Sequence, residues 1–206
     1  MSNSKLSVDQ LVLDRQEYAE RRTAARDRMI PLRRERRLRL GDQLLCEFEN
    51  AETLQYQVQE MVYAEGISDR GEAAAEIEAY ARMLPTSHEL SCTLFIELDD
   101  LQTVRDELER LDGVQHALSI DVDGARVPGR ELPGLDEGAE ANRTAAVHFI
   151  RFTFTDEQRD AFRDPEIPAR LVADHPEYAD DVVIDGPVRL SLLADLALDQ
   201  SAQLRP

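Results

Sequence analysis

Residues 33–65, RRERRLRLGDQLLCEFENAETLQYQVQEMVYAE, decide the fold of the N-terminal half of this chain. Apolar residues alternate with charged ones on both sides of Gly41-Asp42-Gln43, and a period of two predicts two strands joined by a turn. A three-residue turn places Arg37 opposite Glu47 and leaves one face apolar, whereas a two-residue turn would pair Arg37 with Cys46 and mix the faces. The sequence therefore predicts a β-hairpin with a three-residue turn.

We expect a helix to follow the hairpin directly. Asn50 is a favoured N-cap residue, and Gly66 is the residue type that most often ends a helix. Between them an apolar stripe recurs at helical spacing, formed by Leu54, Val58, Met61 and Val62. Glu65 falls within this stripe, so we expect its carboxylate to be at least partly buried. We expect it to pair with an arginine, either from residues 33–39 or Arg143.

The rest of the chain carries helical and strand patterns in turn. Asp14 and Asp69 each begin a capping box, and Pro31 should kink or restart the first helix. From Glu89 on, the patterns predict strands at 90–98, 114–122 and 147–154, helices at 101–111 and 155–162, short strands at 169–173 and 182–184, and a last helix at 185–198. Glycines and prolines in residues 123–142 predict a long mobile loop.

These elements predict an α+β protein in two parts. Residues 1–86 would form a helical region that contains the hairpin at about 37–49. Residues 87–206 follow the order strand, helix, strand, strand, helix, strand, which suits a ferredoxin-like antiparallel sandwich with an added strand and a C-terminal helix. The strands alternate between apolar and polar residues, so a parallel sheet is the less favoured alternative.

Composition narrows the classes of partner. The net charge is −18 and the pI is near 4.6, which makes nucleic acids and anionic membranes poor partners. No apolar run is long enough to span a membrane, and no secretory segment opens the chain. With two cysteines only, Cys46 and Cys92, these features predict a cytoplasmic location. The acidity fits either a base-composition bias or a high-salt lineage.

The motifs of several enzyme classes are absent. There is no CxxC, HExxH or Glu-x-x-His, which disfavours a zinc ribbon, a zincin and a rubrerythrin-type diiron bundle. There is likewise no GxSxG, GxGxxG or GxxxxGK. Cys46 and Cys92 lie on predicted apolar faces, where thiols are packing groups that react slowly. The sequence therefore leaves both the cofactor and the question of enzymatic activity undetermined.

Two groups of polar residues are candidates for a site. The arginines of residues 33–39 form either a solvated basic face or a clamp for an anion. The candidate anion- or ligand-binding residues are Arg36, Arg37, Glu49, Asn50, Gln57, Glu60, Glu65 and Arg143. The candidate metal ligands are His116, His148 and Glu89. The two histidines lie on apolar faces of neighbouring predicted strands, either as hydrogen-bonded core residues or as a two-histidine ligand set.

Five short motifs resemble a widespread bacterial family of unknown function. They are RRERRLRLG, FEN, QVQEM, IEAY and ELSCTLFIE, in this order along residues 33–97. The resemblance covers most of the chain and fades in residues 123–141. It implies a genomic association with rubrerythrin-like diiron proteins and iron–sulfur oxidoreductases, and it carries over no catalytic residue.

Two hypotheses about function follow. The first is a non-catalytic accessory protein that binds a partner in a cytoplasmic redox or peroxide-defence system, for example a rubrerythrin-like or iron–sulfur protein. The second is a metal- or anion-binding enzyme or sensor with a Glu/His/Arg site between the two halves.

Overall fold

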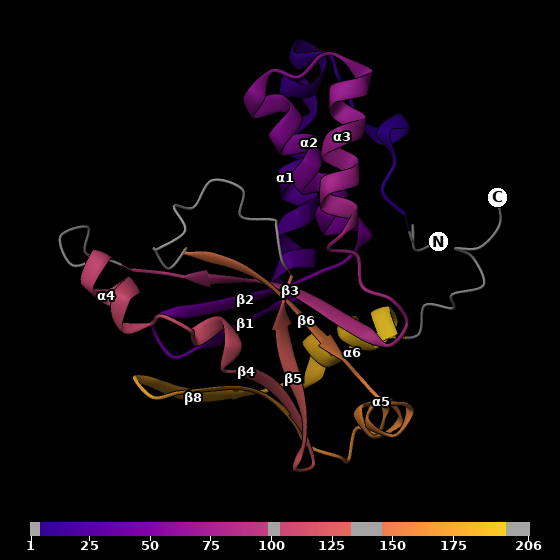
Figure 1. The fold of residues 1–206 in the computed structure, drawn as a ribbon. Coiled ribbons are helices and arrows are strands. Elements are labelled where there is room, and N and C mark those ends of the chain that lie inside the picture. The colour runs from indigo at the N-terminus through magenta and orange to yellow at the C-terminus, as the bar shows by residue number, and fades with distance from the viewer. Residues whose placement is uncertain (1–4, 99–103, 133–145, 197–206) are drawn as a thin grey trace.

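The computed structural model describes residues 5–98, 104–132 and 146–196 (Figure 1). The N-terminal part contains the 3-10 turn η1 (Val8–Gln10), α1 (Arg15–Arg34), β1 (Arg37–Leu40), β2 (Leu44–Glu49), α2 (Ala51–Glu65) and α3 (Arg70–Ala81). It is followed by β3 (Glu89–Ile96), α4 (Val104–Arg110), the 3-10 turn η2 (Val114–His116), β4 (Leu118–Val122), β5 (Ala125–Glu131) and β6 (Val147–Thr153). The chain continues with α5 (Asp156–Arg163), β7 (Ala169–His175), β8 (Tyr178–Val183) and α6 (Gly186–Leu196).

The hairpin of β1 and β2 has the predicted register. Arg37 lies opposite Glu47 and Leu40 lies opposite Leu44, so the turn is the expected three residues long. Gly41 has a φ of 55°, in the left-handed region that a glycine adopts without strain. The Cβ of any other residue at this position would also overlap the hydroxyl of Tyr178. Both observations explain why the turn begins with glycine.

The ends of α2 also agree with the sequence. Asn50 caps the helix, because its side chain accepts hydrogen bonds from the backbone N–H groups of Glu52 and Thr53. Thr53 returns the contact by accepting from the Asn50 N–H at 2.9 Å, and Gly66 ends the helix in the left-handed conformation. The expectation for Glu65 was wrong. Its side chain is exposed, whereas Leu54, Val58 and Val62 of the stripe are buried.

The strands form one curled sheet in the order β1-β2-β3-β6-β5-β4-β7-β8, with antiparallel neighbours throughout. The curl is nearly barrel-shaped, since the Tyr178 hydroxyl of β8 donates to the Leu40 carbonyl of β1 at 2.7 Å. The protein is therefore a mixed α/β fold, as expected. A ferredoxin-like arrangement is not confirmed, because β7 pairs with β4 and not with β3. The sheet also crosses the boundary drawn near residue 86, because β2 pairs with β3.

Two expectations for the middle of the chain were wrong. Residues 114–116 form a 3-10 turn and only 118–122 are a strand, so His116 is exposed instead of lying on an apolar strand face. Residues 125–131, predicted as part of a mobile loop, form β5 between β4 and β6. Only Val127 is buried along β5, which hides the strand pattern. Gly129 is needed there, because a Cβ would lie 2.8 Å from an Ile150 methyl group and 3.0 Å from the Leu118 carbonyl. The remaining residues predicted as loop, from 133 on, lie outside the described residues.

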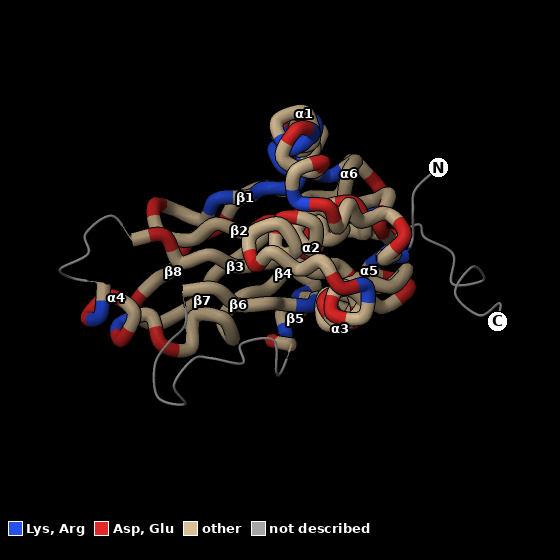
Figure 2. Tube along the Cα trace, turned by 90° about the horizontal axis from the view of Figure 1, so that it is seen from above, with Lys and Arg blue, Asp and Glu red and all other residues tan. Residues whose placement is uncertain are grey.

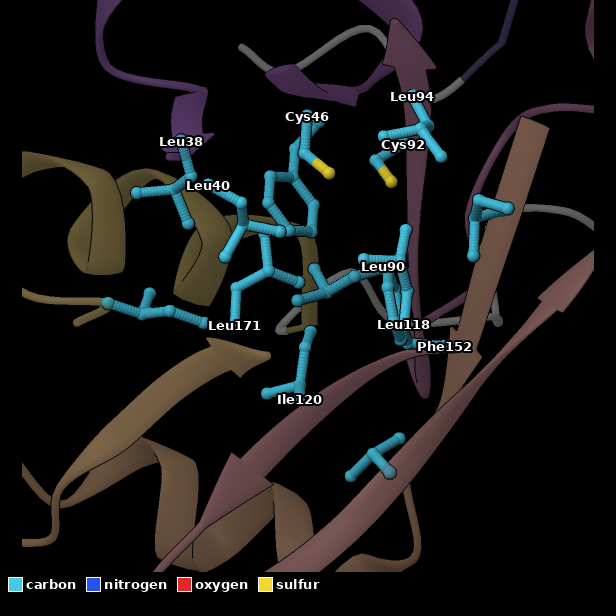
Figure 3. Close-up of a cluster of buried hydrophobic side chains, with 14 of the residues drawn as sticks. Leu38, Leu40, Cys46, Leu90, Cys92, Leu94, Leu118, Ile120, Phe152 and Leu171 are labelled. Atoms are coloured by element: carbon cyan, nitrogen blue, oxygen red, sulfur yellow. The ribbon is translucent and has the colours of Figure 1, made fainter. Parts of the chain in front are cut away.

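The main core fills the inner face of the curled sheet, which α5 and α6 cover with Phe162, Leu192 and Leu196 (Figure 1). Figure 3 shows the sulfur atoms of Cys46 and Cys92 within this cluster of leucine, isoleucine and phenylalanine side chains. Both thiols are free and fully buried, as the sequence predicted.

Helices α1, α2 and α3 stand together on the outer side of the sheet, and we call them the helical arm (Figure 1). Helix α1 continues through Pro31, so the helix does not restart there. Residues 7–12 lie along α2. The Gln55 side-chain amide accepts from the Ser7 N–H and donates to the Ser7 carbonyl. The Gln59 side-chain amide makes the same pair of hydrogen bonds with the backbone of Val12. Within the described residues, no helix has the length and apolar character needed to cross a bilayer.

Candidate functional site

A layer of polar side chains lies between the sheet and the helical arm. Strands β2 and β3 turn Glu47, Glu49, Ser91 and Thr93 toward the arm, and all four are buried. Helix α2 contributes Thr53 and Gln57. We call these six residues the polar layer. Strand alternation produces it, because each of these strand residues neighbours a core residue that points the opposite way.

Glu49 is the most enclosed carboxylate of the polar layer, with no exposed surface. Its Oε1 atom accepts from the Thr93 hydroxyl at 2.6 Å and from the Gln57 amide at 2.9 Å. Its Oε2 atom lies 2.5 Å from the Thr53 hydroxyl. Burial raises the pKa of Glu49, and the hydrogen bonds from Thr53 and Thr93 offset only part of that effect. Glu49 therefore holds a proton more readily than an ordinary glutamate.

Glu47, two residues earlier on β2, has cationic partners instead. Its Oε2 atom lies 2.6 Å from Arg37 Nε, and its Oε1 atom lies 2.8 Å from Arg33 Nε. The second contact is an ion pair without hydrogen-bond geometry. Arg33 also places its guanidinium carbon 5.3 Å from the centre of the Tyr56 ring. Two of the five arginines in residues 33–39 thus anchor the end of α1 and the hairpin to each other.

Arg36 is buried, and its guanidinium contacts groups within the same chain. Its guanidinium donates to the Phe48 carbonyl at 2.7 Å, to the Glu49 carbonyl at 3.2 Å and to Ser191 Oγ at 2.9 Å. It also forms an ion pair with Asp195 of α6. Burial raises the pKa of Asp195, although Arg36 counteracts this. In this state Arg36 joins β1, β2 and α6, and its guanidinium is not directed at open solvent.

The groove between α1 and α2 has a volume of about 610 Å³. Its lining includes Tyr18, Arg21 and Arg28 from α1, and Ala51 and Tyr56 from α2. The candidate residue Asn50 also lines it. The Tyr18 hydroxyl of this lining donates to Glu60 at 2.7 Å, and Arg22 donates to the same carboxylate at 2.7 Å within an ion pair.

The ionisation states of Glu60 and Tyr18 set the charge beside the groove. Burial acts to raise the pKa of Glu60, but the hydrogen bonds from Arg22 and Tyr18 lower it overall, so the carboxylate stays ionised. The pKa of Tyr18 is raised, first by burial and then by Glu60, so its hydroxyl remains a donor. A neutral tyrosine and two arginines therefore line the groove, and an ionised glutamate accepts a hydrogen bond from that tyrosine.

Of the predicted metal ligands, the two histidines contact the same carboxylate, Glu131, whereas Glu89 lies apart from them. His148 is buried on β6 as expected, and its Nδ1 atom lies 2.7 Å from Glu131 Oε1 of β5. His116 Nε2 lies 3.8 Å from Glu131 Oε2. Glu89 is five residues along β3 from Leu94, the partner of His148, and instead forms an ion pair with Arg151 at 3.8 Å. The described parts of the chain hold no group of three or more His, Cys, Asp or Glu side chains suited to a metal ion.

The structure thus brings some predicted residues together and separates others. Glu49 and Gln57 meet in the polar layer, and Arg37 joins it through Glu47. Asn50 lines the groove, and Glu60 contacts the groove residue Tyr18. Arg143 lies outside the described residues. The sequence analysis missed Thr53, Thr93, Asp195, Glu131 and Tyr18. Thr93 could have been found from strand alternation, but Asp195 and Glu131 had no local signal.

Comparison with known proteins identifies the family of this chain. Residues 5–196 match the family described as a protein of unknown function, DUF3501. The chain belongs to the DUF3501 family. This confirms the resemblance that the five motifs carried. Among curated proteins, none matches the chain.

One solved structure is similar to this DUF3501 chain over nearly its whole length. It is the crystal structure of a novel protein of unknown function from Burkholderia pseudomallei K96243. The two chains share 32% identity with a TM-score of 0.83, over 93% of this chain and 99% of the other. The DUF3501 fold is therefore common to both proteins, and neither name assigns an activity.

Proposed function

We propose that this DUF3501 protein is a non-catalytic accessory protein that binds a partner protein through its helical arm, in a cytoplasmic redox or peroxide-defence system. The observation that carries the proposal is the groove of about 610 Å³ between α1 and α2. It follows α1 from Tyr18 to Arg28, a length of about 15 Å at the rise of an α-helix. A segment of a partner protein fits a groove of this length.

The charge of α1 favours an acidic partner segment. Helix α1 holds seven arginines against three acidic residues, hence a net charge of +4, in a chain whose net charge is −18. Figure 2 shows basic positions along α1 and β1. Only Tyr18 and Met29 are buried among the 20 residues of α1, so most of its surface is open to a partner. Opposite charges on two surfaces speed their encounter and fix their orientation.

The internal contacts of the polar layer support an accessory role. Arg36 and Arg37 bind groups within the same chain, and Glu49 accepts its hydrogen bonds from neutral side chains. We infer that the main role of these side chains is to stabilise the packing of the helical arm on the sheet. The redox setting, and rubrerythrin-like or iron–sulfur proteins as partners, come from the family association alone.

Binding to purified candidates tests the proposal. The full chain would be titrated calorimetrically with a rubrerythrin-like diiron protein and with an iron–sulfur oxidoreductase from the same organism. We expect a complex with one of them whose affinity falls at least about tenfold, 1.4 kcal/mol, in the double variant Arg21→Glu/Arg28→Glu. Higher salt should weaken the wild-type complex as well.

A matched control is Arg105→Glu/Arg126→Glu. It makes the same change in net charge and also removes two exposed ion pairs, those with Glu109 and Asp174, away from the groove. Equal losses in both double variants would contradict the groove as the binding site. The alternative is a metal- or anion-binding enzyme or sensor with a site between the two halves. Stoichiometric metal in protein purified without a chelating tag, with no affinity for either candidate, would favour that alternative.

A further inference from the structure

The two oxygen atoms of the Glu49 carboxyl group have unequal surroundings. Oε1 accepts two hydrogen bonds, from the Thr93 hydroxyl and the Gln57 amide. Oε2 contacts the Thr53 hydroxyl at 2.5 Å. Among the described residues, no arginine, lysine or histidine side chain binds either oxygen, and the residue has no exposed surface. A fully buried carboxylate without a cation is costly, and protonation removes that cost.

Thr53 can accommodate such a proton. Its hydroxyl oxygen lies 3.1 Å from the Asn50 carbonyl, a second acceptor for the hydroxyl hydrogen. The same oxygen accepts from the Asn50 backbone N–H at 2.9 Å and retains a second lone pair. When its hydrogen turns toward Asn50, the Thr53 oxygen can accept a hydrogen bond from Glu49. The Glu49 Oε1 atom would keep both of its donors, so every polar atom of the set stays satisfied.

We propose that Glu49 is a buried proton-binding site at the base of the helical arm. The folded chain holds it as a neutral carboxylic acid whose Oε2–H donates to Thr53. When the first turn of α2 lifts from the sheet, the O–H bond breaks, the proton passes to water and the carboxylate becomes hydrated. The site concerns the free protein and stands independently of the partner proposed above.

The charged surroundings agree with a neutral Glu49. Among the described residues, the charged and titratable groups around it are Glu47 on β2, Arg36 beside β1 and Tyr80 on α3, with Cys92 of β3 on the opposite face of the sheet. Glu47 disfavours a second negative charge. Arg36 donates to the Glu49 carbonyl, not to its carboxylate, and forms its ion pair with Asp195. Burial, as the larger cause, raises the pKa of both Tyr80 and Cys92, which keeps these two neutral.

The proton is linked to the cap of α2. Asn50 and Thr53 form the capping box of that helix, so the direction of the Thr53 hydroxyl depends on whether Glu49 is protonated. When Glu49 ionises, the Thr53 hydroxyl hydrogen turns toward Glu49, and a buried negative charge remains beside Glu47. This charge weakens the packing of the helical arm on the sheet. The arm should therefore open more readily as the pH rises.

Infrared difference spectroscopy tests the protonation state. We expect folded wild type at pH 7 to show a carboxylic-acid C=O band that shifts on ¹³C labelling of glutamate. Glu49→Gln should lose this band and the neighbouring variant Glu47→Gln should keep it. Thr53→Val retains the carboxyl group but removes its acceptor, so the band should persist at a shifted frequency even if Glu49→Gln fails to fold. A folded wild type with no glutamate acid band at pH 7 would overturn the proposal.

Hydrogen exchange tests the link to the arm. We expect the amides in the first turn of α2 to gain exchange in wild type as the pH rises, beyond the intrinsic base dependence, and Glu49→Gln to lack this gain. The same pH dependence in both proteins would refute the coupling, even where the infrared band is present.

Discussion

Arg37 on β1 lies directly opposite Glu47 on β2, and its Nε atom is 2.6 Å from Glu47 Oε2. Because Arg33 of α1 approaches the other oxygen of the same carboxylate, one buried glutamate joins the hairpin to the helix before it. Ion pairs of this kind matter most when one partner is removed, since the remaining charges lose their partner inside the protein.

Glu47→Gln should therefore destabilise the protein by about 2 kcal/mol in urea unfolding. The cost stays below that of a fully buried pair because Arg33 and Arg37 are partly exposed and can be hydrated. Glu65→Gln is the matched control, since Glu65 is an exposed glutamate at the end of α2. It should change the free energy of unfolding by less than about 0.5 kcal/mol. Equal effects of the two substitutions would disprove the structural role of Glu47.

Gly41→Val should destabilise the protein by about 2 kcal/mol or more. The φ of 55° strains a β-branched residue, and the added Cβ meets the Tyr178 hydroxyl and lies 2.7 Å from Asp180 Oδ2. Gly124→Val separates the two causes, because Gly124 has a φ of 82° and nothing within 4 Å of an added Cβ. Thermal unfolding should show a larger loss for Gly41→Val. A loss no larger than that of Gly124→Val would mean that β8 does not pack on the turn.

The stability difference between Glu49→Gln and wild type should depend on pH. The folded state raises the pKa of Glu49, so the folded protein retains the proton at a pH at which the unfolded chain has lost it. The stabilisation from this proton is complete below the ordinary glutamate pKa of about 4.3 and is lost as pH rises toward the folded pKa.

Urea unfolding from pH 4 to pH 8 measures this linkage. The Gln variant should gain on wild type as pH rises, by at most about 1.4 kcal/mol per pH unit, and the gain should level off above the folded pKa. Glu47→Gln serves as the control. A constant difference between Glu49→Gln and wild type would mean that Glu49 titrates alike in both states.

Cys46 and Cys92 should remain reduced and should react with a thiol reagent only as fast as the protein unfolds. Both thiols are fully buried, and burial raises the pKa of Cys92, which lowers the fraction of thiolate. Labelling in native buffer and in urea, followed by mass spectrometry, compares the two rates. Fast labelling of the native protein, or a disulfide between the two residues in fresh protein, would contradict this packing.

Features set by residues close in sequence were predictable. The Arg37–Glu47 register follows from a three-residue turn and strand alternation, and both are local. The capping residues Asn50 and Thr155 bind backbone groups within three positions of themselves, so their sequence patterns were sufficient. Apolar alternation also placed Cys46 and Cys92 in the core.

Features set by distant residues came only from the tertiary structure. Glu65 was expected to be buried and Glu49 was not, yet Glu49 is buried where α2 packs over β2 and Glu65 is exposed. Strand β5 forms because β4 and β6 supply its hydrogen-bond partners, although its own sequence has little apolar alternation. Burial depends on what covers a residue, and that cover comes from elements far away in the chain. The sequence by itself therefore determined the local turns, caps and core faces, and the packing of the arm on the curled sheet decided which polar residues share a site.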